Sequence, residues 1–106
     1  MGLFKKKLTV NMAINKVRTT ENAYLIDCRT KSEYKSGHVS GAINWPADTM
    51  TEERTLRRFQ DKEAELYLVG SYSQKPEAAV KKFKKMGYRN VEAGGLMEEH
   101  HGLLVK

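Results

Sequence analysis

Two short runs of apolar residues limit the folds that this chain can adopt. Residues 23–28 read AYLIDC and residues 66–69 read LYLV, so almost every position in both runs is apolar. A half-exposed strand would alternate polar and apolar residues, whereas an unbroken apolar run suits a strand buried on both faces of a parallel sheet. With 106 residues, the chain has room for one hydrophobic core. We therefore predict a single domain over residues 1–106.

Two longer helices are expected from the spacing of apolar residues. Residues 10–17 repeat apolar side chains at helical spacing, and Asn11 is the expected N-cap. Residues 76–86 do the same after Pro76, which suits the first turn of a helix, and Gly87 is the expected stop. Each of these helices therefore has one apolar face for packing against a sheet.

Shorter helical segments are expected in three further places. Residues 31–36 form a helical turn that Gly37 closes, and residues 97–101 form a closing segment. Thr49 and Glu52 have the spacing of a capping box at the start of another helix, which would bury Leu56 and Phe59.

The remaining apolar stretches predict short strands at residues 8–10, 42–45 and 90–92. Strands and helices then alternate along the chain, which is typical of an α/β domain with a mainly parallel sheet. We predict a three-layer α/β/α domain with a central sheet of five strands and helices on both faces.

The formal net charge is +6, and lysines account for much of it. Lysine clusters lie at residues 5–7 and 81–85. A solvated helix face explains such clusters without a partner, and an anionic partner is the alternative. Phe83 lies among these lysines but belongs to the apolar stripe of the helix, so it is not expected to be exposed as a platform for single strands would require, and we expect no nucleic-acid partner.

Several other classes of site and location are not expected from the sequence. Cys28 is the single cysteine, so the chain can form neither an internal disulfide nor a cysteine zinc site. No apolar run reaches the roughly 20 residues of a membrane span, and the start lacks a signal-peptide pattern, so we expect a cytoplasmic protein. His100 and His101 beside two glutamates lack a third ligand at suitable spacing. We predict no metal and no cofactor.

A known family becomes recognisable at residues 25–44, which read LIDCRTKSEYKSGHVSGAIN. The stretch resembles the rhodanese family pattern of an apolar strand, Asp-x-Arg, Glu-Tyr, Gly-His-Ile and Gly-Ala-x-Asn. The related catalytic domain of cell-cycle dual-specificity phosphatases carries the same pattern. Residues 86–91, followed by Gly94 and Gly95, resemble a second segment of the family. The resemblance implies a rhodanese fold and covers most of the chain from Tyr24 onward.

Four polar residues of the first motif are expected to support a loop and not to react. Asp27 ends a buried strand, where its carboxylate can accept hydrogen bonds from backbone N–H groups. Arg29 is expected to neutralise nearby carboxylates and to pair with Glu33 across a short turn. His38 can tie a loop through hydrogen bonds.

The resemblance also implies where a catalytic cysteine would stand, at the end of the strand before a loop and helix. Val69 occupies that position here, or Gly70 if the alignment moves by one residue, and neither has a nucleophilic atom. The loop that would surround the sulfur is Gly70, Ser71, Tyr72, Ser73, Gln74 and Lys75, with Gln74 where the family often has arginine. Free backbone N–H groups of this loop and of the helix start would favour a weakly bound anion.

Cys28 is the remaining candidate nucleophile. It follows Asp27 within the buried strand, where an apolar environment raises the pKa of a thiol and makes it inert. We therefore predict a non-catalytic rhodanese-like module that binds an unknown protein partner or a small anion at the retained loop. The alternatives are a thiosulfate or persulfide sulfurtransferase that uses Cys28, and a polyanion binder that uses the basic helix. The oligomeric state does not follow from the sequence.

Overall fold

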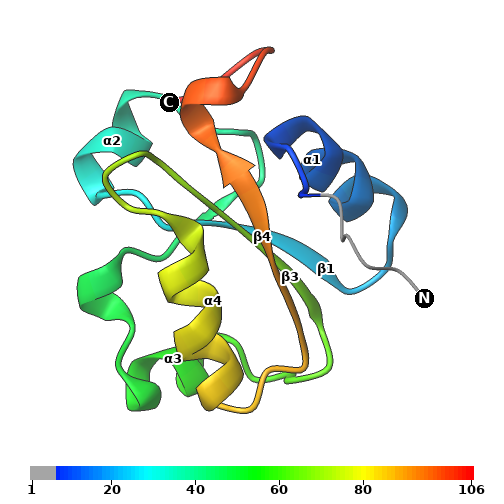
Figure 1. The fold of residues 1–106 in the computed structure, drawn as a ribbon, viewed down its shortest axis with the longest axis vertical. Helices are drawn as coiled ribbons and strands as arrows, with labels where there is room; N and C mark the ends of the chain where they lie inside the picture. The colour runs from blue at the N-terminus through cyan, green and yellow to red at the C-terminus, as the bar shows by residue number, and fades with distance from the viewer. Residues whose placement is uncertain (1–6) are drawn as a thin grey trace.

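Four parallel strands form the centre of the structure, a computed structural model that describes residues 7–106 (Figure 1). The strands are β1 (Ala23–Asp27), β2 (Ile43–Asn44), β3 (Glu65–Gly70) and β4 (Asn90–Leu96), in the sheet order β2-β1-β3-β4. The two apolar runs of the sequence are β1 and β3, the two inner strands. The prediction of a parallel sheet with buried central strands is therefore confirmed.

The expected fifth strand at residues 8–10 does not form. The hydroxyl oxygen of Thr9 accepts a hydrogen bond from the Met12 N–H group at 3.2 Å, so Thr9, and not Asn11, is the N-cap. Helix α1 (Val10–Thr19) begins at the next residue. Val10 is buried as a residue of this helix, so its β-branched side chain packs in the core without being part of a strand. The sheet thus has four strands instead of five.

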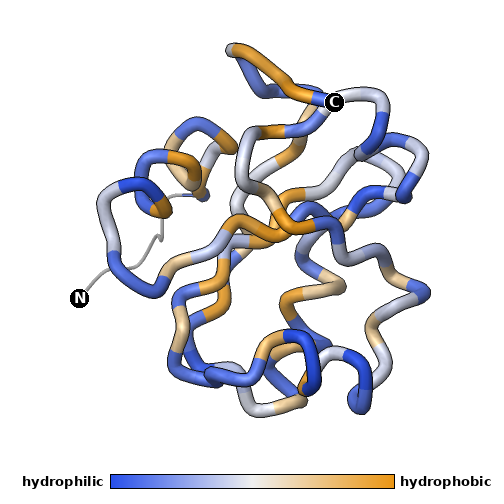
Figure 2. The backbone as a smooth tube through the Cα atoms, turned by 180° about the vertical axis from the view of Figure 1, so that it is seen from behind, coloured by the Kyte–Doolittle hydropathy of each residue, from blue (hydrophilic) through white to orange (hydrophobic). Residues whose placement is uncertain are grey.

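Helices cover both faces of the sheet, as predicted. α1 packs on one face, where Tyr34 of α2 (Lys31–Ser36) joins the same apolar cluster. α3 (Glu52–Arg58) and α4 (Pro76–Lys85) lie side by side on the other face, as Figure 1 shows. Figure 2 shows the hydrophobic residues gathered along the central strands between these layers. Within residues 7–106, no helix has the length and apolar character that crossing a bilayer requires.

The start of α3 differs from the capping box that the sequence suggested. Thr51 is the N-cap, because its hydroxyl oxygen accepts a hydrogen bond from the Arg54 N–H group at 3.2 Å. Thr49 instead ends a short 3-10 helix, η1 (Ala47–Thr49), where its hydroxyl donates to the carbonyl oxygen of Pro46 at 2.6 Å. Phe59 is buried as expected, and Leu56 is half-buried.

β4 extends further than the strand predicted at residues 90–92 and includes Gly94 and Gly95. A Cβ atom on Gly94 would lie 3.0 Å from the Cβ of Ala13 and 3.2 Å from a methyl carbon of Val69. Gly95 has a φ of 97° and lies against the start of α1. The glycines therefore allow α1 to pack directly on the strand. A second 3-10 helix, η2 (Met97–Glu99), follows β4 and replaces the longer closing helix.

A cluster of aromatic side chains fixes α3 against α4. The rings of Phe59 and Phe83 lie 5.9 Å apart, and those of Phe83 and Tyr88 lie 5.2 Å apart. The buried hydroxyl group of Tyr88 donates to the backbone carbonyl oxygens of Phe59 and Thr55, at the end of α3. These contacts make α3 and α4 one layer with a shared core.

The substitution Tyr88→Phe is expected to lower the free energy of unfolding by about 1–3 kcal/mol, because the Phe59 carbonyl oxygen loses a buried donor. Urea denaturation followed by circular dichroism measures the change. Tyr24→Phe is the matched control, since Tyr24 is 42% exposed, and it should cost less than about 0.5 kcal/mol. Equal losses in the two variants would show that the Tyr88 hydroxyl does not hold the end of α3.

Candidate functional site

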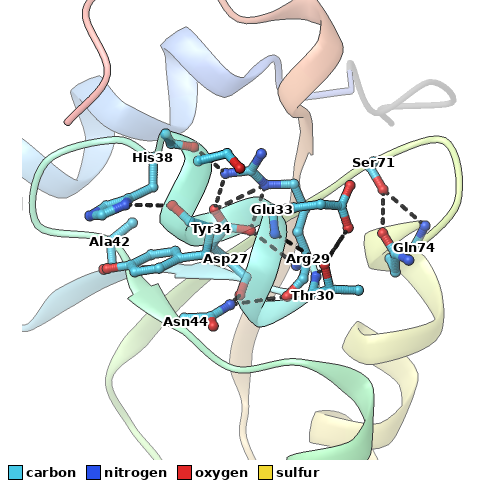
Figure 3. A network of polar contacts seen from close by, with 12 residues as sticks. Asp27, Arg29, Thr30, Glu33, Tyr34, His38, Ala42, Asn44, Ser71 and Gln74 are labelled. Atoms are coloured by element: carbon cyan, nitrogen blue, oxygen red, sulfur yellow. Dashed lines mark hydrogen bonds and ion pairs between the residues drawn. The ribbon is translucent and has the colours of Figure 1, made fainter. Parts of the chain in front are cut away.

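A buried ion pair forms at the carboxyl end of β1 (Figure 3). The guanidinium of Arg29 binds both carboxylate oxygens of Asp27, with Nε 3.0 Å from Oδ1 and Nη2 2.8 Å from Oδ2. The Asp27 side chain is 1% exposed, and its Oδ1 also accepts the backbone N–H group of Arg29 at 3.0 Å. Burial opposes the charge on Arg29, but the hydrogen bond and negative charge of Asp27 outweigh it and raise the pKa of Arg29.

Glu33 forms no direct ion pair with Arg29, so that expectation was wrong, although its negative charge contributes to the raised pKa of Arg29. Its carboxylate accepts hydrogen bonds from the backbone N–H group and the hydroxyl of Thr30, at 3.2 and 2.8 Å. The Thr30 hydroxyl in turn accepts the Glu33 N–H group, which completes a capping box at the start of α2. The carboxylate of Asp27 forms the ion pair because it is buried next to the guanidinium. The carboxylate of Glu33 instead caps the start of α2. The second Arg29 contact runs from Nη2 to the carbonyl oxygen of Gly37 at 2.8 Å.

His38 ties the end of α2 to the C-terminal segment through hydrogen bonds, in line with the role predicted for it. Its Nδ1 lies 2.8 Å from the carbonyl oxygen of Tyr34, and the two rings stack with centroids 3.6 Å apart. The backbone of His38 also exchanges two hydrogen bonds of 2.8 Å with Val105. The hydroxyl of Tyr34 donates to the carbonyl oxygen of Ala42 at 2.6 Å. This segment is therefore held from several directions.

Asn44 is a supporting residue that sequence reasoning did not identify. Its side-chain amide donates to the carbonyl oxygens of Asp27 and Arg29, both at 3.0 Å. These bonds join the ends of β1 and β2, where Asn44 pairs in register with Asp27. The final position of the Gly-Ala-x-Asn motif was the available signal.

The loop between β3 and α4 closes on itself through Ser71 and Gln74 (Figure 3). The Ser71 N–H group donates to the Gln74 carbonyl oxygen at 3.0 Å, and the Gln74 N–H group donates to the Ser71 hydroxyl at 3.1 Å. That hydroxyl donates to the Gln74 side-chain oxygen at 2.6 Å. The sequence led us to expect free N–H groups here, and these two have protein acceptors instead.

Glu98 supplies an acceptor for a third N–H group of this loop. Its carboxylate accepts the N–H group of Tyr72 at 3.0 Å, although 26 residues separate the two in sequence. Its negative charge also contributes to the raised pKa of Arg29. A carboxylate of the protein itself thus stands where we expected an external anion to bind.

Gly70 and Val69 face different surroundings at the end of β3. Val69 is fully buried in the cluster that packs under α1. Gly70 lies under the loop: a Cβ atom there would come within 2.1 Å of the Gln74 carbonyl oxygen and 2.9 Å of the Pro76 Cδ. The Val69 side chain therefore packs under α1, whereas a side chain at position 70 would point toward the loop. No side chain fits at this residue unless the loop moves.

Cys28 is 4% exposed and belongs to the apolar cluster under α3 and α4. Burial raises the pKa of its thiol to about 12, and the negative charge of Asp27 adds to the rise. Cys28 also lines a cavity of about 440 Å³, beside Ser73 and Lys75 of the loop and Ala79 of α4. The thiol is thus near the loop but is not activated by it.

His100 and His101 do not assemble a ligand set. Nδ1 of His100 lies 2.9 Å from the side-chain oxygen of Asn11, and the His101 carbonyl oxygen accepts from the Asn11 amide at 3.3 Å. In the part of the chain that the structure describes, no three histidine, cysteine, aspartate or glutamate residues converge as a metal site would need.

These features define one class of protein. It is a parallel α/β domain with an Asp–Arg ion pair at the end of one strand and a strand-to-helix loop at the end of the neighbouring strand. The family model for the Rhodanese-like domain matches residues 9–96. The chain therefore belongs to the rhodanese-like domain family.

Curated relatives place this domain both alone and within larger proteins. Thiosulfate sulfurtransferase PspE of Escherichia coli is 30% identical over 97 residues, which cover 91% of this chain and 92% of PspE. The tRNA uridine(34) hydroxylase of Buchnera aphidicola is 30% identical over 83 residues. Adenylyltransferase and sulfurtransferase uba4 of Ogataea parapolymorpha is 28% identical over 79 residues. The matched part covers 74% of this chain in both cases, but 26% of the hydroxylase and 20% of uba4.

Solved structures show the same fold. A rhodanese with anions from E. coli superposes with a TM-score of 0.69 at 28% identity, covering 79% of this chain and 98% of that one. A rhodanese-like domain protein from Staphylococcus aureus superposes with a TM-score of 0.71 at 24% identity, covering 89% of each chain.

Removal of the buried guanidinium tests the role of the ion pair. Arg29→Gln is expected to lower the free energy of unfolding by about 3–5 kcal/mol, because Asp27 is left as an uncompensated buried charge. Arg57→Gln is the matched control: Arg57 pairs with Glu53 at 3.0 Å, but both side chains are more than 70% exposed. It should cost less than about 1 kcal/mol. Chemical denaturation of both variants measures the two losses of stability. Similar losses would show that the buried ion pair contributes no more to stability than the exposed one.

The raised pKa of Cys28 predicts how its reactivity depends on pH. Because alkylation requires the thiolate, the rate with iodoacetamide should increase about tenfold per unit from about pH 7 to about pH 10, without a plateau. In denaturant the same rate should level off above about pH 8.5. A plateau near pH 8.5 in the folded protein would show that the thiol is not held in an apolar environment.

Proposed function

We propose that this chain is a non-catalytic rhodanese-like domain that acts as a binding or regulatory module. The observation that carries the proposal is the backbone above Gly70, where the Gln74 carbonyl oxygen fills the space that a side chain would need. A sulfur carrier at this position requires both a thiol and an open loop. This chain has a glycine beneath a closed loop.

The chemistry of sulfur transfer supports the same proposal. A thiolate must attack the outer sulfur of thiosulfate, release sulfite and carry that sulfur as a persulfide to an acceptor. Neither Val69 nor Gly70 has an atom that can do this. With a pKa of about 12, Cys28 is a thiolate in only about one molecule in a hundred thousand near neutral pH.

One observation favours the alternative of a sulfurtransferase that uses Cys28. The cavity of about 440 Å³ brings this residue to the same hollow as Ser73 and Lys75 of the loop. PspE, which carries the name thiosulfate sulfurtransferase, is 30% identical to this chain. The non-catalytic module and the sulfurtransferase that uses Cys28 make opposite predictions for an assay of sulfur transfer.

What the module binds is also part of the proposal. The N–H groups of Ser71, Tyr72 and Gln74 already have protein acceptors, and the Tyr72 acceptor is the carboxylate of Glu98. This arrangement favours a macromolecular partner at the outer surface over a small anion in the loop. If a small anion bound there, it would have to displace Glu98 against charge repulsion.

The test is the transfer of sulfur from thiosulfate to cyanide, measured as thiocyanate, with E. coli PspE as the active control. We expect no turnover above background and no gain of one sulfur atom by intact-mass spectrometry after incubation with thiosulfate. Turnover that is lost in Cys28→Ser would refute the proposal and assign the reaction to Cys28. Turnover that survives Cys28→Ser comes from a contaminant, since the chain has no other thiol, and further purification should remove it.

A further inference from the structure

The positive charge of this domain is concentrated in one layer. The α3–α4 layer, defined as residues 51–63 and 75–89, contains ten Lys or Arg and five Asp or Glu residues. The other described residues contain seven and eight, so the layer has a net charge of +5 and the rest of the described chain has −1. All ten basic side chains of the layer belong to exposed residues. The sequence alone suggested a basic helix, and the structure adds the arginines of α3 beside it.

Most of this charge is not neutralised within the domain. Arg57 pairs with Glu53 and Arg89 pairs with Glu63, at 3.0 and 3.6 Å. Lys81, Lys82 and Lys85 form no ion pair with any residue from 7 to 106. Like charges three and four positions apart on a helix repel each other. One lysine near the end of the helix would be enough to interact favourably with the helix dipole. The additional lysines repel each other, and an external polyanion would relieve that repulsion.

The layer has no apolar anchor on its surface. The exposed large hydrophobic side chains among the described residues are Met12, Tyr24, Tyr72, Leu103, Leu104 and Val105, and none belongs to the layer. Protein interfaces concentrate their binding energy in buried aromatic and apolar anchors, and insertion into a membrane also needs apolar side chains. Phosphate groups of a nucleic acid, in contrast, can be bound by Lys and Arg side chains without an apolar anchor. The surface chemistry therefore favours nucleic acid.

An aromatic side chain stands at the edge of this layer. Tyr72 is 62% exposed and lines the cavity of about 440 Å³ together with Lys75 and Lys82. Met50 and Ala79 provide an apolar lining of the same cavity. A ring beside basic side chains is the combination that binds an unpaired base together with its backbone. Phe83, the aromatic residue between the lysines of α4, is fully buried, so Tyr72 is the exposed ring that the loop brings beside them.

We propose that the α3–α4 layer binds the phosphate backbone of a single-stranded nucleic acid and that Tyr72 stacks on one of its bases. α4 is about 15 Å long, a distance that about four phosphates of a stacked strand would cover. The proposal depends on surface charge and Tyr72, so it stands or falls independently of sulfur transfer.

Fluorescence anisotropy with a labelled oligouridylate of about 15 nucleotides tests the proposal in the full-length chain. We expect a dissociation constant of about 10 µM at low salt, within the range of sequence-independent binding. Contacts with about four phosphates predict a loss of affinity of about 50-fold between about 50 and 200 mM salt. A duplex of equal length should bind more weakly, because its bases cannot reach Tyr72.

Two matched pairs of variants locate the site. Replacement of Lys81, Lys82, Lys84 and Lys85 by Gln should weaken binding by more than about tenfold and reduce the salt dependence. The control replaces Lys16, Arg18, Lys31 and Lys35 by Gln, which removes the same charge from exposed positions of α1 and α2. Tyr72→Ala should weaken binding about tenfold and Tyr72→Phe should not, whereas Tyr24→Ala serves as the exposed-tyrosine control.

Several outcomes would overturn the proposal. Absence of binding at about 100 µM protein, or equal losses in both quadruple variants, would show that the layer is not a nucleic-acid site. Equal binding of the duplex, or no effect of Tyr72→Ala, would remove the single-strand preference. Competition by polyglutamate as strong as by RNA would identify an acidic protein as the partner, and stronger binding to phosphatidylserine vesicles would identify a membrane surface.

Discussion

The ion pair between Asp27 and Arg29 is the constraint on which the rest of the site depends. A carboxylate that is almost completely buried at the end of β1 requires a partner, and Arg29 provides it with two parallel hydrogen bonds. The same guanidinium holds the Gly37 carbonyl oxygen and thereby fixes the end of α2. Asn44 then joins this point to β2. One buried charge thus organises three segments.

This domain combines the hydrogen-bonded network around Asp27 and Arg29 with a closed loop between β3 and α4. The Asp27–Arg29 pair is held by several hydrogen bonds, while the loop backbone lies directly over Gly70 and the N–H groups of Ser71, Tyr72 and Gln74 have protein acceptors. The fold alone does not determine the chemistry at this loop, because function depends on the residues of the site. Stability of the fold and reactivity of the loop depend on different residues, and substitutions can separate them.

The features that the sequence predicted well are those that local chemistry determines. The apolar runs defined β1 and β3, and Pro76 marked the start of α4. Local patterns were ambiguous where two neighbouring residues could play the same role. Thr9 and Asn11 are both suitable N-cap residues, and Thr9 is the one that caps α1. The contact of Glu98 with Tyr72 could not be predicted, because it joins residues far apart in the chain. The same holds for the closed loop, since its hydrogen bonds depend on the paths of β3 and α4.

The glycine at position 70 restricts which substitutions this loop can accept. Any larger residue must push back the Gln74 carbonyl group, and this breaks the loop's hydrogen bonds before a new side chain can be useful. A single substitution at this position therefore carries a structural penalty, because the loop must move before a larger side chain fits. Substitutions on the outer surface of the domain carry no such penalty, so the domain tolerates sequence change there more readily than at Gly70.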